Sequence, residues 1–345
     1  MEKEQNYPTI SGSEALIRSL IAEGVDTMFG YPGGAIMPVF DAIYDNKENI
    51  KHVVVRHEQG AVHAAQGYAR VSKKVGVALV TSGPGATNAI TGITDAMMDS
   101  TPMVVISGQV VSSLLGTDAF QEADVIGVTQ PITKWAYQIR RVEDIPWAVS
   151  RAFYIARSGR PGPVVLDITK DAQVNQCEYK YEKTTHLRSY EPVPEIDVEK
   201  IKHAAEIINA AKKPFILVGQ GVLLGNAEDE LKTFLEKSGI PFASTLLGLS
   251  AMPTEHPLYT GMLGMHGNIG PNMNTNNCDV LIAIGMRFDD RVTGNLASYA
   301  KQAKIIHFDI DSGEMNKIVK TTVKVLGNAK ETLPLITQFV EEKKY

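Results

Sequence analysis

The chain alternates short apolar runs with helical patterns in two successive blocks, and this alternation constrains its fold more than any other feature. From Ser13 to Asp171 the strand-sized runs include Val75–Val80, and helical patterns separate them. A second block begins at Val198 and contains runs such as Val280–Gly285. This alternation is typical of parallel sheets with helices packed on both faces. The sequence therefore predicts the α/β class, with two doubly wound parallel sheets.

Between the two blocks, residues 176–196 show no periodicity and include Pro192 and Pro194, as is typical of a linker. The 345 residues then divide into a first domain over 1–175, the linker, and a second domain over 197–345. This division agrees with a domain size of roughly 150 residues.

Three local expectations concern how the elements begin and end. Ser13 is expected to cap a helix over Glu14–Glu23, and Ala86–Met98 is expected to form one continuous helix. The second block is expected to hold five strands, at Phe215–Val218, Phe242–Thr245, Val280–Gly285, Ile305–Ile310 and Val323–Leu326.

Charge and cysteine usage exclude several classes of protein. The formal net charge of −5 argues against a nucleic-acid-binding or membrane-surface protein, which would show a basic surplus. No apolar run approaches the ~20 residues of a membrane-spanning helix. Cys177 and Cys278 stand far apart and in no ligand spacing, which favours a reducing cytoplasm and predicts no metal site on this chain.

In the first block, the loops that follow predicted strands carry the candidate chemistry, because ligands of open α/β sheets bind beyond the carboxyl ends of strands. Gly30–Ala35 either lets a ligand approach the backbone or is a tight turn that binds nothing, and the turn is the more common case. Glu58 either complements a helix dipole from solvent or hydrogen-bonds a heterocycle nitrogen and relays a proton. Thr81–Asn88 contains Gly-Pro-Gly but lacks the P-loop lysine. Phe120, within Ser112–Asp124, either packs against neighbouring side chains or lines a substrate site.

In the second block, Gly219–Gly225 has the pattern G-x-G-x-x-x-G, one residue longer than the dinucleotide fingerprint. Gly285–Arg291 carries four charged residues directly after a predicted strand, and so many charges do not fit a buried core. Asp309 suits a ribose hydroxyl, although carboxylates at strand ends are common without ligands. His266 has no second ligand at metal-binding spacing.

Several short motifs follow one another along the chain: Tyr31–Ala35 (YPGGA), His57–Ala61 (HEQGA), Ser82–Asn88 (SGPGATN), Asp118–Glu122 (DAFQE), Gly159–Pro163 (GRPGP), Leu263–Gly267 (LGMHG) and Arg287–Gly294 (RFDDRVTG). From about Ser11 onward the chain thereby resembles the catalytic large subunits of the acetolactate synthase family, also called acetohydroxyacid synthases. These are thiamine-diphosphate enzymes of branched-chain amino-acid biosynthesis. The first two motifs are shared with many thiamine-diphosphate enzymes, whereas Met265–Gly267 together with Arg287–Gly294 is far more specific.

The resemblance implies that the first domain binds the pyrimidine of thiamine diphosphate and that the second is a Rossmann-like central domain that binds FAD. Glu58 would hydrogen-bond the aminopyrimidine and favour the tautomer that removes the thiazolium proton, beside Tyr31, Gly33 and Pro84. The implied substrate-channel residues are Phe120, Gln121, Lys170, Met265, Asp290 and Arg291, of which Arg291 suits a keto-acid carboxylate. The implied FAD-contacting residues are Arg160, Gly219, Gly221, Thr245, Leu246, His266, Gly285, Met286, Arg287, Asp289, Asp309, Ile310 and Asn328.

The implied reaction is decarboxylation of pyruvate and carboligation to a second pyruvate or to 2-ketobutyrate. The family further implies a homodimer or higher homo-oligomer through helices near Glu58–Tyr68 and Ala89–Met98, and a regulatory small subunit. Its chains continue into a third domain that holds Mg²⁺ and the diphosphate with a Gly-Asp-Gly motif, which this sequence lacks. Asn328 stands where an aspartate is expected. We therefore expect a two-domain fragment that is inactive alone.

Two alternatives remain open. One is another thiamine-diphosphate enzyme of the pyruvate oxidase, glyoxylate carboligase or decarboxylase type, against which the two specific motifs argue. The other is a non-catalytic FAD-binding or assembly module of the same fold. An NAD-dependent dehydrogenase fits poorly, because neither glycine loop has the fingerprint spacing.

Overall fold

The computed structural model describes residues 7–345 and divides the chain into two compact units, one ending at Tyr190 and the other beginning at Glu191. The boundary falls within the segment expected to be a linker. Residues 176–178, however, form strand β8 (Gln176–Glu178), which pairs antiparallel with β1 (Thr9–Ser11). The start of the expected linker therefore belongs to the first unit.

The first unit is built on a parallel sheet whose strand order is β3-β2-β4-β5-β7-β6. Its central strands are buried on both faces, so their side chains alternate between two cores: Val77 and Leu79 pack into one, and Ala78 and Val80 into the other. The strands are β2 (Thr27–Gly30), β3 (Lys51–Val54), β4 (Gly76–Val80), β5 (Met103–Gln109), β6 (Trp135–Ile139) and β7 (Pro163–Thr169).

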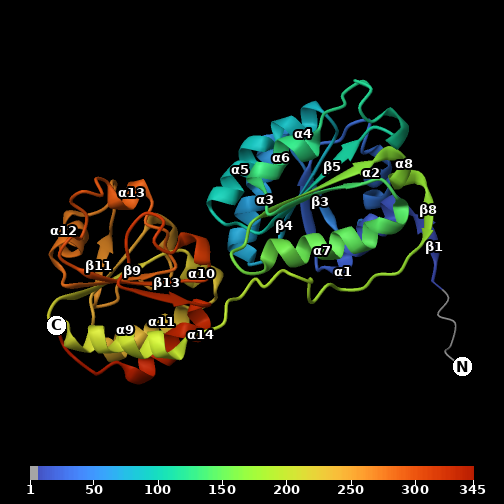
Figure 1. Ribbon diagram of the computed structural model, residues 1–345. Coiled ribbons are helices and arrows are strands. Elements are labelled where there is room, and N and C mark those ends of the chain that lie inside the picture. Colours follow the sequence, from blue (N-terminus) through green and yellow to red (C-terminus); the bar gives the residue numbers. More distant parts are fainter. Residues whose placement is uncertain (1–6) are drawn as a thin grey trace, which may run out of the picture. The chain divides into compact units, whose positions relative to one another are not determined.

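Helices cover both faces of this sheet (Figure 1). One face carries α1 (Gly12–Ala22), α2 (Met37–Asp45), α7 (Ile145–Arg157) and α8 (Lys170–Val174). The other carries α3 (Glu58–Ser72), α4 (Pro84–Asn88), α5 (Ile90–Met98) and α6 (Val125–Thr129). Short 3₁₀ turns lie at Ser112–Leu114, Gln130–Ile132 and Val142–Asp144.

Two local expectations in this unit are wrong. Ser11, not Ser13, caps α1: its Oγ accepts from the Glu14 amide, whereas the Ser13 hydroxyl donates to the Gln173 carbonyl. The expected helix over residues 86–98 is two helices. The amide of Ala89 bonds to the Ala86 carbonyl, a tightened turn that separates α4 from α5.

The second unit has a parallel sheet of order β11-β10-β9-β12-β13-β14. The sheet has six strands rather than the five expected, because β11 contains Gly261 and has no apolar run to reveal it. The strands are β9 (Pro214–Val218), β10 (Phe242–Ser244), β11 (Tyr259–Met262), β12 (Val280–Ile284), β13 (Lys304–Asp309) and β14 (Val323–Leu326).

Helices α9 (Val198–Ala210), α11 (Glu228–Ser238) and α14 (Ala329–Phe339) cover one face of this sheet. The opposite core draws on connecting segments between Leu263 and Ala300. The remaining elements are α10 (Gly221–Leu224), α12 (Ile269–Asn277), α13 (Asp290–Thr293) and 3₁₀ turns at Leu246–Gly248 and Ser312–Glu314. Two parallel sheets with covered faces confirm the predicted doubly wound α/β class.

In each unit the first strand of the six-stranded sheet lies inside the sheet and not at its edge, and later strands are added on both sides of it. In the first, β3 is added on one side of β2 and β4 on the other; in the second, β10 and β12 flank β9. Ligands of such sheets bind at this switch point, beyond the carboxyl ends of the strands. The two switch points are therefore where each unit is expected to bind a ligand.

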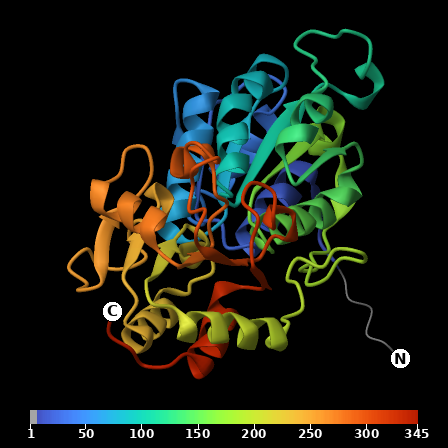
Figure 2. The same cartoon turned by 60° about the vertical axis from the view of Figure 1, so that its left-hand side comes forward.

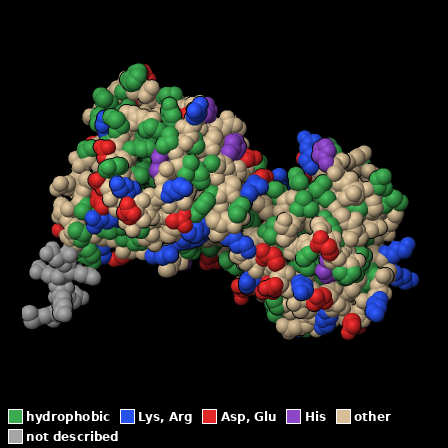
Figure 3. Space-filling model, turned by 180° about the vertical axis from the view of Figure 1, so that it is seen from behind, with side chains coloured by type: hydrophobic (Ala, Val, Ile, Leu, Met, Phe, Trp, Pro, Cys, Tyr) green, Lys and Arg blue, Asp and Glu red, His purple; other side chains and the backbone are tan. Residues whose placement is uncertain are grey.

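The surface of the described chain carries mixed charge. On the face seen in Figure 3, acidic and basic side chains are interspersed rather than gathered by sign. None of the helices within residues 7–345 has both the length and the apolar character needed to cross a bilayer.

Candidate functional site

Glu58 lies at the switch point of the first unit as the first residue of α3, directly after β3. His57 caps the helix, its Nδ1 accepting from the Gln59 amide. The Glu58 side chain is buried, with 7% exposed. Its Oε2 accepts a hydrogen bond of 2.9 Å from Asn88 Nδ2, and its Oε1 faces Gly85, where a Cβ would lie 3.3 Å away. A carboxylate is thus held in place with one oxygen left beside a bare backbone.

Two glycines keep the space beside this carboxylate free of side chains. A Cβ on Gly33 would lie 2.5 Å from Thr81 Cβ, and one on Gly85 would lie 2.8 Å from Thr81 Cγ2. Thr81 Oγ1 is buried and has no hydrogen-bond partner within the part of the chain that the structure describes. Tyr31 follows β2, and Pro84 is the first residue of α4; both lie at the same edge of the sheet. A buried carboxylate and an unpaired hydroxyl next to bare glycines suit a flat heterocycle with polar ring atoms, as an aminopyrimidine has.

The segment that carries Phe120 and Gln121 reaches the same edge of the sheet from β5. A Cβ on Gly83, which has φ of +44°, would lie 2.3 Å from the Gln121 carbonyl oxygen, so the two backbones touch. Phe120 is 87% exposed. Lys170 begins α8 directly after β7, and its amide bonds to the Val110 carbonyl at 3.4 Å. The predicted channel residues of this unit therefore line up along the carboxyl ends of β4, β5 and β7.

Glycines also shape the switch point of the second unit, where the loops after β9 and β12 meet backbone to backbone. The Gly219 amide bonds to the Ile284 carbonyl, and the Gly221 amide bonds to that of Gly285, both at 2.9 Å. A Cβ on Gly221 would lie 2.5 Å from Gly285 Cα, and Gly285 itself has φ of +61°. A side chain at either position would collide with the facing backbone, so this close approach of the two loops requires glycine on both sides.

The other predicted FAD contacts of this unit stand mostly at the same carboxyl edge. Thr245 follows β10 and caps the next turn, while Asn328 follows β14 and caps α14, with its Oδ1 accepting from the Lys330 amide. Asp309 ends β13; its Oδ1 accepts from the Asp311 amide, and its side chain is 13% exposed. The remaining members are Leu246, Met286, Arg287, Asp289, Ile310 and His266, of which Met286 packs its side chain into the core.

Met265, Asp290 and Arg291 come together although two loops supply them. The Met265 amide bonds to the Arg291 carbonyl at 2.7 Å, and Arg291 Nη1 lies 3.8 Å from Met265 Sδ. Arg291 Nε lies 3.8 Å from an Asp290 carboxylate oxygen, with both side chains mostly exposed. The guanidinium is thus held at its base and keeps donors available to a carboxylate.

Comparison with known proteins bears on what these two edges bind. Residues 10–128 match the N-terminal TPP-binding domain of thiamine pyrophosphate enzymes, and residues 201–336 match their central domain. The chain belongs to the thiamine pyrophosphate enzyme family. The first match covers the loops that hold Tyr31, Glu58 and Pro84.

Several thiamine pyrophosphate enzymes resemble this chain over nearly its whole length. The acetolactate synthase large subunit of Buchnera aphidicola (subsp. Schizaphis graminum) is 48% identical over 97% of this chain and 59% of the relative. That of Corynebacterium glutamicum is 47% identical over 97% and 53%, and the isozyme 3 large subunit of Escherichia coli K12 is 46% identical over 97% and 58%. The resemblance to acetolactate synthase large subunits is confirmed, and the chain spans between half and three-fifths of their length.

Arg160 is set apart from the other predicted FAD contacts. It lies in the first unit between α7 and β7, and its Nε donates to Ser100 Oγ at 2.8 Å. Both residues precede strands, so Arg160 stands at the amino edge of its sheet, opposite the edge that carries Glu58.

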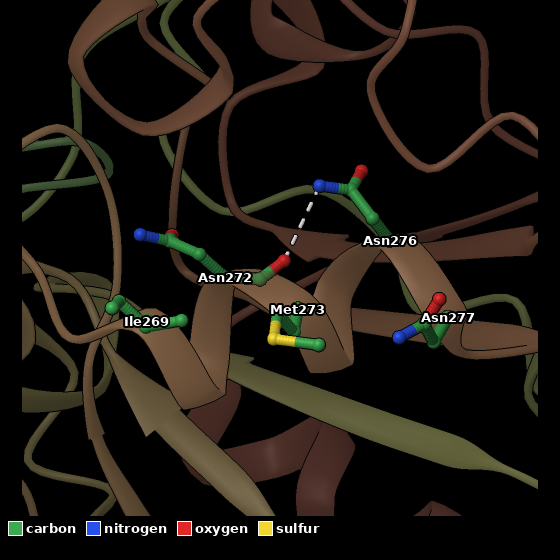
Figure 4. Close-up of a pocket in the computed structure, with 5 residues that line it drawn as sticks. All are labelled: Ile269, Asn272, Met273, Asn276 and Asn277. Carbon is green, nitrogen blue, oxygen red and sulfur yellow. Dashed lines mark hydrogen bonds between the residues drawn. The ribbon is translucent and has the colours of Figure 1, made fainter.

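A surface groove of about 380 Å³ lies along α12 (Figure 4). It is lined by Ile269, Asn272, Met273, Asn276 and Asn277. Two of its amide side chains have structural roles. Asn272 exchanges two hydrogen bonds with the backbone of Gly264. Asn276 donates to the Asn272 carbonyl and accepts from the Ala300 amide. Asn272 and Asn276 thus support the backbone around Gly264 and Ala300. Within residues 7–345, no group of three or more His, Cys, Asp or Glu side chains is placed to hold a metal ion.

The sequence analysis assigned no role to two residues that complete the first site, Asn88 and Thr81. Both belong to the Gly-Pro-Gly motif region, so their position was visible. What the sequence does not show is that α4 turns the Asn88 amide back onto Glu58, or that the Thr81 hydroxyl lacks a partner.

We expect Gly33→Ala to lower the free energy of unfolding by about 1–3 kcal/mol, because its Cβ would enter the space of Thr81. Gly34→Ala is the matched control in the same loop, since a Cβ there meets no atom within 4 Å. It should change stability by less than about 1 kcal/mol. Urea denaturation of both variants measures the difference. An equal loss of unfolding free energy in the two variants would contradict the close contact between Gly33 and Thr81.

Proposed function

We propose that this chain supplies the pyrimidine-binding and central domains of an acetolactate synthase large subunit. The reaction is thiamine-diphosphate-dependent decarboxylation of pyruvate, followed by carboligation to a second pyruvate or to 2-ketobutyrate. The observation that carries the proposal is the buried Glu58 carboxylate, held by Asn88 beside a glycine-lined space in a chain with 46–48% identity to acetolactate synthase large subunits.

Thiamine diphosphate, when bound, supplies the acidic thiazolium carbon on which the keto acid reacts. The chain's own part begins at Glu58, whose Oε1 would accept a hydrogen bond from a protonated pyrimidine ring nitrogen and would so favour the basic imino tautomer of the amino group. Asn88 fixes the other oxygen, so the carboxylate keeps one orientation. Phe120, Gln121 and Lys170 would line this site within the first unit.

In the second unit, Arg291 would bind the carboxylate of a keto acid with two guanidinium donors, and Met265 and Asp290 steady its side chain. FAD would be held by the glycine loops of Gly219, Gly221 and Gly285, and Asp309 would accept from a ribose hydroxyl. Mg²⁺ and the diphosphate belong, in this proposal, to a part of the relatives that this chain does not match. Two buried free thiols, Cys177 and Cys278, agree with a cytoplasmic location.

The function is tested by a chimera in which this chain replaces the matching part of the Escherichia coli isozyme 3 large subunit. The chimera should form acetolactate from pyruvate, and Glu58→Gln should lower kcat by about 10²–10⁴-fold, because the amide cannot relay the proton. Glu143→Gln is the matched control, since Glu143 is exposed and follows β6, the strand at the opposite end of the sheet from β3. A chimera that makes no acetolactate, or full activity of Glu58→Gln, would contradict the proposal.

Flavin binding is tested on the purified 345-residue chain itself. We expect it to retain or take up FAD, seen as yellow colour and flavin fluorescence. Gly221→Ala should abolish this signal, because its Cβ would lie 2.5 Å from Gly285 Cα. Gly270→Ala, where a Cβ meets no atom within 4 Å, should bind flavin normally. Absence of flavin from the unchanged chain at saturating FAD would rule out the central-domain assignment.

We also propose a homodimer that buries α3 and α5, with a regulatory small subunit as a further partner. The two helices pack side by side: a Cβ on Gly92 of α5 would lie 2.7 Å from Val62 of α3. Helix α3 exposes Gly60 and Gly67 to solvent. Light scattering at micromolar concentration should report a dimer, and Gly67→Arg should shift it to monomer. A stable monomer of the unchanged chain would exclude the interface.

A further inference from the structure

The segment 112–124, which presents Phe120 and Gln121, holds a strained backbone at the carboxyl edge of the first unit. Asp118 and Gln121 have φ of +57° and +58°, in the left-handed region that side chains other than glycine rarely adopt. The segment projects from the body of its unit (Figure 2). Strain of this kind persists only where surrounding contacts fix the conformation.

Part of the fixing is internal to the segment. The Glu122 carboxylate accepts hydrogen bonds from the amides of Gly116 and Ala119, and these bonds lower the pKa of Glu122. They close the turn but do not orient it against the sheet. That orientation needs a contact to a strand.

The contact to the sheet comes from Gln109, the last residue of β5, which is fully buried. Its Nε2 donates to the Ala123 carbonyl at 2.9 Å and to Asp167 Oδ2 at 3.2 Å, while its Oε1 accepts from the Val110 amide. Every polar atom of this amide is therefore engaged, and its orientation is fixed. One of its bonds holds the backbone immediately after Gln121 and Glu122.

Asp167 is an unusual residue for its position in the middle of β7. Its neighbours on the strand are Val165, Leu166 and Ile168, and it is fully buried. Burial raises the pKa of Asp167 to about 6, against two amide donors, Gln138 and Gln109, with Asp124 as the nearby acidic group. An apolar side chain would fit this position with a lower desolvation penalty. The role of the carboxylate therefore lies in the two amides that it holds, those of Gln109 and Gln138.

We propose that Asp167 and Gln109 are positioning residues that hold the Phe120–Gln121 segment at the substrate side of the sheet through the Ala123 carbonyl. The inference rests on the proposed function for the role of that segment. The anchoring itself is a property of the chain alone. Neither residue touches the substrate in this proposal; they act through the backbone.

The test compares two identical substitutions at the two amides that donate to the same carboxylate oxygen. Gln109→Met removes the bond to Ala123, whereas Gln138→Met removes the other bond to Asp167 and leaves the segment untouched. Hydrogen exchange by mass spectrometry on the 345-residue chain should show roughly tenfold faster exchange over residues 116–125 in Gln109→Met. In Gln138→Met the exchange should match the unchanged chain. Unchanged exchange in Gln109→Met, or equal acceleration in both, would overturn the proposal.

A second pair of variants decides the question if Gln109→Met does not fold. Asp167→Asn keeps a carbonyl oxygen for the Gln109 amide and should preserve the protection of the segment, whereas Asp167→Leu removes the acceptor and should accelerate exchange there. Equal exchange in the two Asp167 variants would contradict the proposal. This readout needs no turnover, so a chimera without acetolactate activity would refute the proposed function and leave the anchoring standing.

Discussion

Parallel strand pairing is the constraint on which the rest of this molecule depends. Because all strands of a six-stranded sheet run the same way, every strand ends at one edge, and residues far apart in the sequence gather there. Because each sheet starts with an interior strand, there is one place where neighbouring loops lead to opposite faces. Gly33 and Gly85 flank that place in the first unit, and Gly219 and Gly285 flank it in the second.

The two switch points share a topology but differ in what they offer a ligand. The first places the ionisable side chain of Glu58 near Thr81 Oγ1, a hydroxyl without a hydrogen-bond partner in residues 7–345, which suits hydrogen bonding to ring nitrogens and movement of a proton. The second brings backbone against backbone at Gly221 and Gly285, with Asp309 further along the edge. That arrangement suits an extended nucleotide that is held rather than transformed. The fold alone therefore does not decide the chemistry; the side chains at each edge do.

Much of the architecture could be predicted, for a physical reason. Strands buried on both faces must be continuously apolar, so β4 and β12 stand out in the sequence. Edge strands escape this rule: β6 carries Gln138 and aromatic side chains, and β11 contains Gly261, so neither produces an apolar run. Caps were harder, because Ser11 and Ser13 are equally good candidates until the chain shows which hydroxyl meets the Glu14 amide.

The site follows the same division between what spacing reveals and what folding decides. Motif order located Glu58 and the glycine loops, because a strand followed by a helix fixes where a loop residue emerges. The partners of those residues are non-local: Asn88 meets Glu58 across 30 positions, and Gln109 meets Asp167 across 58. No periodicity in the sequence marks such pairs, so they became visible only in the structure.

Asp167 shows how a site can be stabilised from within the core. A carboxylate between buried strands is costly, and its two amide partners serve only one of its oxygens, since Oδ1 has no partner within residues 7–345. The other oxygen, Oδ2, however, accepts from both amides and so fixes the orientation of the Gln109 side chain. Gln109 passes that orientation to Ala123 and so to a loop whose own backbone is strained. The free energy that burial of this carboxylate costs thus fixes the backbone at the edge of the sheet that carries Phe120 and Gln121.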